Sequence, residues 1–415
     1  MVRRRARGAA GPADGVGGAA PPTPAARTAA AAPAAERAPK AGEPPAAGAA
    51  GPPEPHPAAE VLVATTWECN LACSYCFVRG QGLGAPGVRM TPGLAARVVD
   101  ALDEGLAHVE SVCLHLYGGE PLTNLPAMRA MVERAGIKRP GRFRFAITTN
   151  GVAAGREAFD LLEAGRFQVV LSIDGPAEVH DECRRTPDGR PTHAAVLRFL
   201  ETLRTRTRCP VRGSAVVRSG WSLAQADAYL RSLPIDLIKA QAVRLPPGSP
   251  YALTPAERLQ YLADLEEAGR RVIADLEAGR PPRDDRFSSR VLQLLRGGAR
   301  AAFCGAGVTA FGIAPDGTVL PCVLVDPRRA RLGHVAGAPG EWVEAGLRWR
   351  SAQRPQPRCL SCSAFPLCGG GCPAVLPVCG DDECELVRKN CEVARAVFER
   401  FRAAPHALLA LAGVV

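Results

Sequence analysis

Cysteines in two blocks constrain this chain more than any other feature. Cys69, Cys73 and Cys76 form a CxxxCxxC motif in the stretch TTWECNLACSYCFVRG, and seven of the nine cysteines between residues 304 and 391 form a second pattern. Fifteen cysteines in 415 residues are too dilute for a disulfide scaffold, and their spacings are those of metal ligands. The ten cysteines of the two blocks therefore predict iron-sulfur sites.

The first motif supplies three ligands to a cluster that has four iron corners, so one iron stays open for a substrate or cosubstrate. The motif follows an apolar run, VLVATTW, which predicts a loop at the C-terminal end of a β-strand. Active sites of α/β barrels lie at that end of the strands. This placement favours catalysis over a structural metal site.

Three later apolar runs end in stretches that are suited to ligand contacts. SVCLHLYGGEPL ends at Gly118, Gly119 and Glu120, where glycines permit close backbone approach and a carboxylate can accept from an ammonium group. RFRFAITTNGV ends at residues 148–151, a polar strand end that is equally consistent with turn chemistry. FQVVLSIDGP carries Ser172 and Asp174 on one face, although an aspartate here would also suit a helix cap.

These motifs resemble the radical S-adenosylmethionine (SAM) superfamily. The resemblance implies that SAM chelates the open iron and is cleaved to a 5′-deoxyadenosyl radical, with Cys69, Cys73 and Cys76 as catalytic cluster ligands. It also implies a set of SAM contacts: Tyr75 near the adenine, Gly118, Gly119 and Glu120 at the amino group, and Ser172 and Asp174 at the ribose and carboxylate. His180, Asp181 and Arg184 match an HDxxR pattern of peptide-modifying members, or equally a solvated helix start.

The second block is similar to the SPASM domain, whose pattern it matches without a missing cysteine. It reads Cys304, Gly317 and Cys322, then a CxxCxxxxxCxxxC run, then a final cysteine. The resemblance implies two auxiliary [4Fe-4S] clusters, one held by Cys304, Cys322 and Cys372, the other by Cys359, Cys362, Cys368 and Cys391. The first of these either has an open iron or borrows Cys379 or Cys384.

Zinc is the alternative for this block, because CxxC pairs also occur in zinc ribbons. An odd number of seven cysteines suits two four-cysteine zinc sites poorly. The remaining cysteines, Cys113, Cys183 and Cys209, are expected to be buried small apolar residues.

The predicted fold is α/β, a partial (β/α)₆ TIM-like barrel followed by a small cysteine-rich cluster domain, because strand-like runs alternate with helical patterns. We expect a disordered Ala/Pro/Arg-rich tail over 1–58, the barrel over 59–250, a helical bridge over 251–300 and the cluster domain with its C-terminal helix over 301–415. The tail is too poor in large apolar residues to form a core. Substrate recognition therefore falls to the barrel, the cluster domain or a separate peptide-recognition protein.

Composition excludes several classes of protein. The sequence has no long apolar run for a membrane span and no leucine-rich signal segment, which predicts a cytoplasmic protein without a membrane partner. The formal charge of +10 comes without a basic run interleaved with aromatics, so we expect no nucleic-acid partner. An acidic peptide is the better partner for a basic surface.

The sequence therefore predicts a radical SAM maturase that oxidises and cross-links a ribosomally made peptide or protein, with a flavodoxin- or ferredoxin-like reductant. Two alternatives stay open. One is an anaerobic sulfatase-maturing enzyme that makes formylglycine, and the other is a zinc-rich scaffold without catalysis.

Overall fold

The computed structural model describes residues 58–83, 87–152, 154–300 and 302–414. They belong to one compact unit, Glu54–Val415. The predicted tail over 1–58 lies outside the described residues except for Ala58, where the first strand begins.

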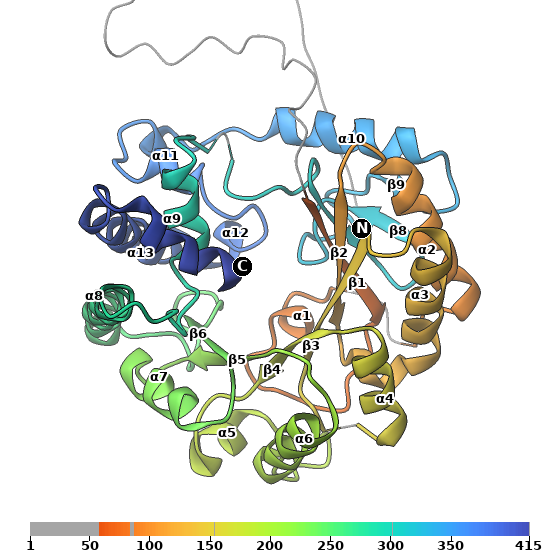
Figure 1. Ribbon diagram of the computed structural model, residues 1–415, viewed down its shortest axis with the longest axis horizontal. Coiled ribbons are helices and arrows are strands. Elements are labelled where there is room, and N and C mark those ends of the chain that lie inside the picture. The colour runs from red at the N-terminus through yellow and green to blue at the C-terminus, as the bar shows by residue number, and fades with distance from the viewer. Residues whose placement is uncertain (1–57, 84–86, 153, 301, 415) are drawn as a thin grey trace, which may run out of the picture. The chain divides into compact units, whose positions relative to one another are not determined.

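One nine-stranded sheet organises this unit, in the order β6-β5-β4-β3-β2-β1-β7-β8-β9. Strands β1 to β6 pair in parallel along the sheet, and each is linked to the next by a helical connection. Because the sheet curves but ends at β6 and β9, the predicted partial barrel is confirmed (Figure 1). Its first six strands are β1 (Ala58–Thr66), β2 (Ser111–Gly118), β3 (Phe143–Thr149), β4 (Gln168–Ser172), β5 (Val211–Val217) and β6 (Leu237–Ala242).

Helices cover the outer face of the curved sheet (Figure 1). Their starts are encoded locally, as in the helix that begins at Pro255, where Thr254 and Glu257 form a reciprocal capping box. The covering helices are α2 (Pro92–Gly105), α3 (Leu125–Lys138), α4 (Arg156–Ala164), α5 (Ala177–Cys183), α6 (His193–Arg206), α7 (Leu223–Ser232) and α8 (Pro255–Glu277). Short helices α1 (Phe77–Gly80) and η1 (Pro121–Asn124) follow the ends of β1 and β2.

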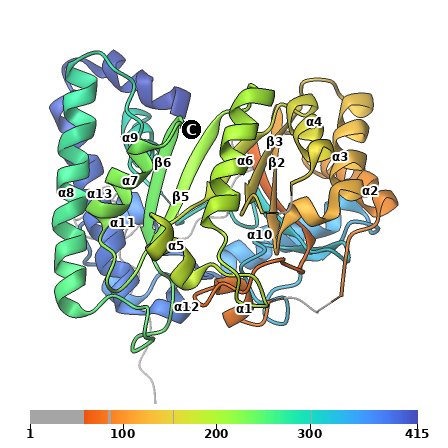
Figure 2. The same cartoon turned by 90° about the horizontal axis from the view of Figure 1, so that it is seen from below.

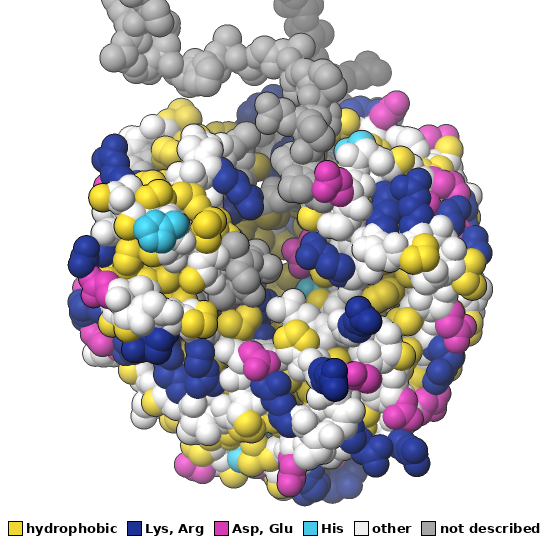
Figure 3. All heavy atoms as spheres, viewed as in Figure 1, with side chains coloured by type: hydrophobic (Ala, Val, Ile, Leu, Met, Phe, Trp, Pro, Cys, Tyr) yellow, Lys and Arg dark blue, Asp and Glu magenta, His cyan; other side chains and the backbone are white. Residues whose placement is uncertain are grey.

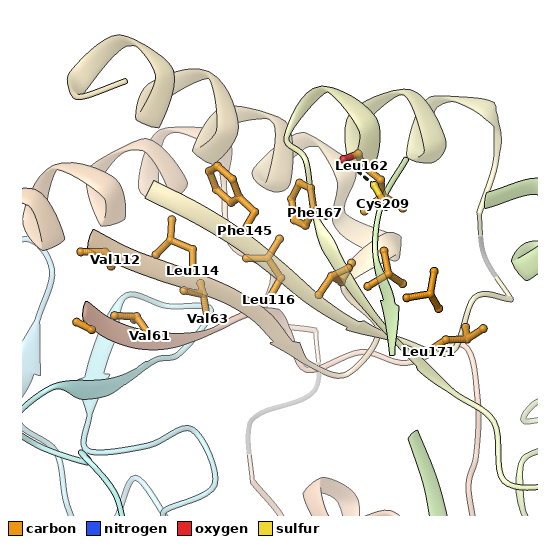
Figure 4. Close-up of a cluster of buried hydrophobic side chains, with 14 of the residues drawn as sticks. Val61, Val63, Val112, Leu114, Leu116, Phe145, Leu162, Phe167, Leu171 and Cys209 are labelled. Carbon is orange, nitrogen blue, oxygen red and sulfur yellow. Dashed lines mark hydrogen bonds between the residues drawn. The ribbon is translucent and has the colours of Figure 1, made fainter. Parts of the chain in front are cut away.

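The two faces of the strands differ in character. Residues such as Val61, Leu114 and Leu116 point outward into a buried apolar core under the helices (Figure 4). Each fully buried side chain of this size contributes about 1.5–3 kcal/mol to stability. The inner face instead carries charged and polar side chains, among them Glu60 and His115, so the interior is an open lumen and not a second core.

The cysteine-rich region continues the same sheet. Strand β7 (Ala310–Ile313) pairs in parallel with β1, and β8 (Thr318–Leu320) and β9 (Gly333–His334) add antiparallel strands beyond it. The region therefore shares the barrel's backbone hydrogen bonding at β1. Its helices are α10 (Pro339–Ala352), η2 (Pro357–Cys359), α11 (Phe365–Cys368), α12 (Leu376–Cys379), α13 (Asp381–Arg400) and η3 (Pro405–Val414).

Long helices connect the two ends of the sheet. Helix α13 packs against α8 and α9 (Ser288–Leu295), which come between the barrel and the cysteine-rich region in sequence (Figure 2). Consequently α9, α12 and α13 face β1 and β2 across the lumen (Figure 1). In the described part of the chain, no helix is both long and apolar enough to cross a lipid bilayer.

Candidate active site

The first cysteine motif lies where predicted, in the loop between β1 and α1 at the C-terminal end of β1. A neighbouring segment holds this loop in place, because Ala72 N donates to Arg185 O at 2.7 Å and Ser74 N donates to Cys183 O at 3.1 Å. The loop therefore depends on the end of α5 for its shape.

The three thiols of the loop are partly buried and lie close together. Burial raises the pKa of Cys69 to about 12, and the neighbouring Glu120, Cys73 and Cys76 add to the rise. The sulfur of Cys69 accepts from Leu71 N at 3.4 Å. Clustered cysteine sulfurs that accept backbone N–H bonds are suited to an iron-sulfur cluster, whose properties such bonds tune. The chemistry of this site thus fits the implied cluster.

Asn150 connects the end of β3 to this loop. Its side-chain nitrogen lies 2.8 Å from Asn70 Oδ1 and 3.8 Å from the sulfur of Cys69, while its side-chain oxygen accepts from Val152 N at 2.9 Å. Asn150 thus serves both as a turn residue and as a donor toward the cysteine site. The sequence offered these as alternatives, and the structure shows both.

Gly118 and Gly119 bring β2 against the backbone of the cysteine loop. A Cβ atom at Gly119 would lie 2.0 Å from the carbonyl oxygen of Glu68, the residue before Cys69. Gly118 has φ of 116°, in the region that favours glycine. The close approach expected of these glycines is thus made to the protein's own loop, and their contact with SAM stays a prediction.

Glu120 ties the ends of β2 and β3 together inside the protein. Its carboxylate accepts from Thr149 Oγ1 at 2.7 Å, Asn150 N at 2.8 Å and Leu122 N at 3.1 Å. Burial raises the pKa of Glu120 to about 6, although the three hydrogen bonds lower it. A buried carboxylate beside the cysteine loop fits the amino group of SAM, although its present bonds give it a structural role as well.

Tyr75, Asp174 and Arg184 form a buried polar cluster beside the loop. The carboxylate of Asp174 accepts from the hydroxyl of Tyr75, from Arg184 Nε at 3.0 Å and from Val216 N at 3.0 Å. The Arg184 guanidinium lies over the Tyr75 ring at 5.4 Å and lowers the pKa that burial raises at Cys73. Asp174 therefore positions the side chains of Tyr75 and Arg184 next to the cysteines. The sequence had suggested only a SAM contact or a helix cap for Asp174.

The remaining residues of these motifs either lie on the inner face of the sheet or support the surrounding helices and loops. Ser172 ends β4 on the inner face of the sheet, at the same height as its partner Ser214 on β5. His180 is fully buried and contacts Thr192 Oγ1 at 3.1 Å. Asp181 accepts from Thr192 N and from the first residue of α6, so it caps that helix. Of the HDxxR pattern, only Arg184 reaches the cysteine site.

The seven later cysteines are expected to form two groups, and their assignment to two clusters stays a prediction. The first auxiliary group comprises Cys304, Cys322 and Cys372, whose thiols influence one another. Burial raises the pKa of Tyr117, on the inner face of β2, and both Cys76 and Cys322 add to that rise. Tyr117 therefore lies between the active-site loop and the first auxiliary group.

The second auxiliary group comprises Cys359, Cys362, Cys368 and Cys391. All but Cys359 pack with Ala364, Leu367 and Val387 in a small core, and Cys359 is buried. Backbone N–H groups of Gly370 and Gly371 donate toward the sulfur of Cys368. Both glycines have positive φ, 96° and 88°, a conformation that side chains disfavour. The Gly-rich turn thus presents donors to this thiol, which suits a cluster ligand.

The two extra cysteines lie near different groups. Cys379 is buried and follows Cys372 by two helical turns in a run whose bonds include Leu376 N to Cys372 O at 2.9 Å and Cys379 N to Val375 O at 3.0 Å. Cys384 instead accepts from Arg358 at 3.6 Å, beside the second group. Of the two predicted alternatives, Cys379 is the better placed to complete the first auxiliary group.

The three other cysteines match the prediction only in part. Cys183 and Cys209 are buried, and the sulfur of Cys209 donates to Leu162 O at 3.3 Å (Figure 4). Cys113 differs, because it is half-buried on the inner face of β2 and lines the lumen. Successive side chains of a strand point to opposite faces, and this alternation places Cys113 on the inner face even though its thiol is apolar in character.

Searching the described residues for a mononuclear metal site gives none: no three His, Cys, Asp or Glu side chains converge closely enough for a single ion. Sequence reasoning missed the roles of Asn70, Tyr117 and the Asp174–Arg184 pair. Asn70 meets Asn150 and Asp174 meets Tyr75 across 80 and 99 positions, so spacing carried no signal for these contacts, whereas Asp174 and Arg184 are only ten positions apart.

Comparison with known proteins supports this geometry. Residues 64–231 match the Radical SAM superfamily. A cysteine-type anaerobic sulfatase-maturating enzyme of Clostridium perfringens (strain 13 / Type A) is 24% identical over 355 residues, which cover 80% of this chain and 92% of that protein. Two other curated relatives are matched over only 39% and 49% of their own length.

Solved structures show the same fold. A structure titled native anSMEcpe with bound AdoMet and Kp18Cys peptide has a TM-score of 0.70 at 21% identity, covering 84% of this chain and 100% of that one. Streptococcus suis SuiB bound to its precursor peptide SuiA has a TM-score of 0.54 at 17% identity, covering 77% and 72%. The likeness to the anSMEcpe structure covers 84% of this chain, which is more than the barrel strands and their helices occupy. It therefore extends into the cysteine-rich region.

The CxxxCxxC loop at the end of β1, the parallel partial barrel and the match over residues 64–231 together identify a radical SAM domain in this part of the chain.

Proposed function

We propose that this protein is a radical SAM maturase that oxidises a peptide or protein substrate in its lumen. The observation that carries the proposal is the position of the three clustered thiols of the β1 loop at the C-terminal edge of a barrel that is open inside. When bound, a [4Fe-4S] cluster and SAM supply a 5′-deoxyadenosyl radical, which abstracts a hydrogen atom from an unactivated carbon.

The chain's own residues have separate tasks in this proposal. Cys69, Cys73 and Cys76 hold the cluster, and Asn150 donates toward the first of them. Tyr75, Gly118, Gly119, Glu120, Ser172 and Asp174 surround SAM, either directly or by fixing the loop that carries it. The buried Arg184 keeps a positive charge beside Cys73, which offsets negative charge at the cluster.

We propose that the seven later cysteines hold two auxiliary [4Fe-4S] clusters, with Cys379 as the fourth ligand of the first group. Backbone donors to Cys322, Cys368 and Cys372 support this assignment. A fully ligated first cluster favours passage of electrons over direct binding of a substrate thiolate. A flavodoxin- or ferredoxin-like protein would supply the electrons for SAM cleavage.

A peptide substrate is supported by the size of the lumen, about 1750 Å³, and by the peptides bound to two proteins of the same fold. Two products stay open. One is a cross-linked peptide, and the other is formylglycine, which the sulfatase-maturating relative favours.

The test uses anaerobically reconstituted protein with SAM, a chemical reductant and short peptides that contain cysteine or serine. We expect 5′-deoxyadenosine together with a peptide that has lost two hydrogens. Retention of sulfur in an oxidised cysteine peptide indicates a new bond, whereas exchange of sulfur for oxygen indicates formylglycine. Protein with full iron that makes no 5′-deoxyadenosine would contradict the proposal.

A further inference from the structure

The lumen carries a large excess of positive charge. Its lining includes eleven arginine or lysine side chains but only three acidic ones, Glu60, Asp285 and Glu383. The face drawn in Figure 3 is hollowed, and basic, acidic and histidine side chains are visible around the hollow. Charges in such a cavity are screened less than those on an open surface, so an anion that enters it is attracted strongly.

Most of the well-buried cations in this lining already have partners. Arg286 pairs with Asp227 and Asp284, and Arg212 pairs with Asp285 at 2.7 Å. Arg300 and Arg350 bond to carbonyl groups of residues 303, 304 and 306, which places their charge beside the auxiliary cysteines. Arg290 donates to Asn390 at 2.8 Å and lies near Cys391. Cluster-bound thiolates would balance these last three cations.

Lys239 is the exception. It lies on the inner face of β6, half-buried, and the described residues give it no hydrogen bond and no carboxylate within 4.0 Å. Burial lowers the pKa of this amine, and so do the nearby Arg212, Arg244 and Arg290, whereas Asp285 and the more exposed Glu60 act against them from beyond 4.0 Å. The ammonium group therefore has no direct ion pair, and the arginines around it outnumber the carboxylates that it senses.

The position of Lys239 relates it to the chemistry. In the strand register, Lys239 pairs with Ser214, and Ser214 pairs with Ser172, which is one of the residues proposed to surround SAM. An anion at Lys239 is therefore held at the level of the proposed SAM site, on the side of the lumen that faces α9.

We propose that Lys239 anchors a carboxylate of the substrate peptide inside the lumen. The carboxylate belongs to an Asp or Glu side chain or to the C-terminus of the peptide. This inference rests on the proposed function, because it takes the lumen as the place where a peptide is modified, and it narrows the substrates to those with a negative charge near the modified residue.

The test measures binding of unlabelled, N-acetylated peptides to the anaerobic holoenzyme by isothermal titration calorimetry. The peptides are GESEG with an amidated C-terminus, its uncharged match GQSQG-amide, and GQSQG with a free C-terminal carboxylate. Tighter binding of the first or the third than of the second, by about tenfold for a charge-assisted contact, is expected. The peptide that binds better identifies the source of the carboxylate. Equal binding of all three would overturn the inference without any variant.

Variants then locate the contact. Lys239→Met is expected to lose the preference for the charged peptide, Lys239→Arg to retain it, and Lys138→Met, a lysine on the outer helix α3, to leave it unchanged. Thermal melting and iron content establish that each variant is folded and loaded. Wild-type preference in Lys239→Met would refute the anchor.

Formation of 5′-deoxyadenosine in the same preparations separates the two proposals. A charge preference without SAM cleavage would leave the anion site standing and remove the proposed function. SAM cleavage without a charge preference would leave the proposed function standing and remove the anion site at Lys239.

Discussion

Gly119→Ala tests how the cysteine loop is held. The added Cβ would lie 2.0 Å from Glu68 O, whereas ordinary contacts begin at 3.4 Å, so the loop must move by roughly 1.4 Å. The three nearest atoms, Glu68 O, Glu68 C and Trp67 C, all belong to the backbone and cannot rotate away. Overpacking of this kind costs about 1–3 kcal/mol, and we expect that loss in the free energy of unfolding of the metal-free protein.

The functional consequence should be confined to the first cluster. We expect Gly119→Ala to lose iron from the site of Cys69, Cys73 and Cys76 and to stop making 5′-deoxyadenosine, while the auxiliary clusters keep their absorbance. Gly93→Ala, at an exposed position of α2 with no atom within 4 Å of the added Cβ, is the matched control and should change stability by less than about 1 kcal/mol. Normal iron and SAM cleavage in Gly119→Ala would refute the packing argument.

Three further predictions concern buried groups. Burial lowers the pKa of His180 from 6.5 to about 4, so the neutral imidazole suits the metal-free fold above pH 6.5. As the pH falls toward 4, the free energy of unfolding should decrease by about 3 kcal/mol. Urea unfolding at several pH values should show this decrease, and His180→Gln should lack it. Asp174→Ala leaves Arg184 buried without its partner and should cost about 3–5 kcal/mol in chemical denaturation, and an unchanged midpoint would count against the buried pair. Cys379→Ser should change the electron paramagnetic resonance spectrum of the first auxiliary cluster while Cys384→Ser does not, and the opposite pattern would assign the ligand to Cys384.

The sequence predicted the fold well because the relevant signals are local. Strand-like apolar runs such as SVCLHLYG alternate with helical patterns, and this alternation predicted the partial barrel. The cysteine loop could be placed at the end of β1 for the same reason. The two auxiliary groups were expected from a resemblance in spacing, and their cluster assignment stays a prediction.

Contacts between distant segments could not be predicted in this way. Asp174 meets Tyr75 from 99 positions away, and nothing in either stretch indicates that they share a hydrogen bond. The inner face of the sheet was likewise ambiguous, because alternation does not tell whether polar residues face solvent or a lumen. Lys239 is an example: its strand is evident from sequence, but its lack of a partner is a property of the assembled barrel.

The most direct test of the account is SAM cleavage by anaerobically reconstituted protein, compared between Cys73→Ala and Cys113→Ala. Iron and acid-labile sulfide are measured in the same samples, because a zinc scaffold would contain neither. The account predicts that wild type and Cys113→Ala convert SAM to 5′-deoxyadenosine, whereas Cys73→Ala does not and still keeps its auxiliary clusters. Undiminished cleavage by Cys73→Ala would contradict the assignment of the first motif as the site of radical formation.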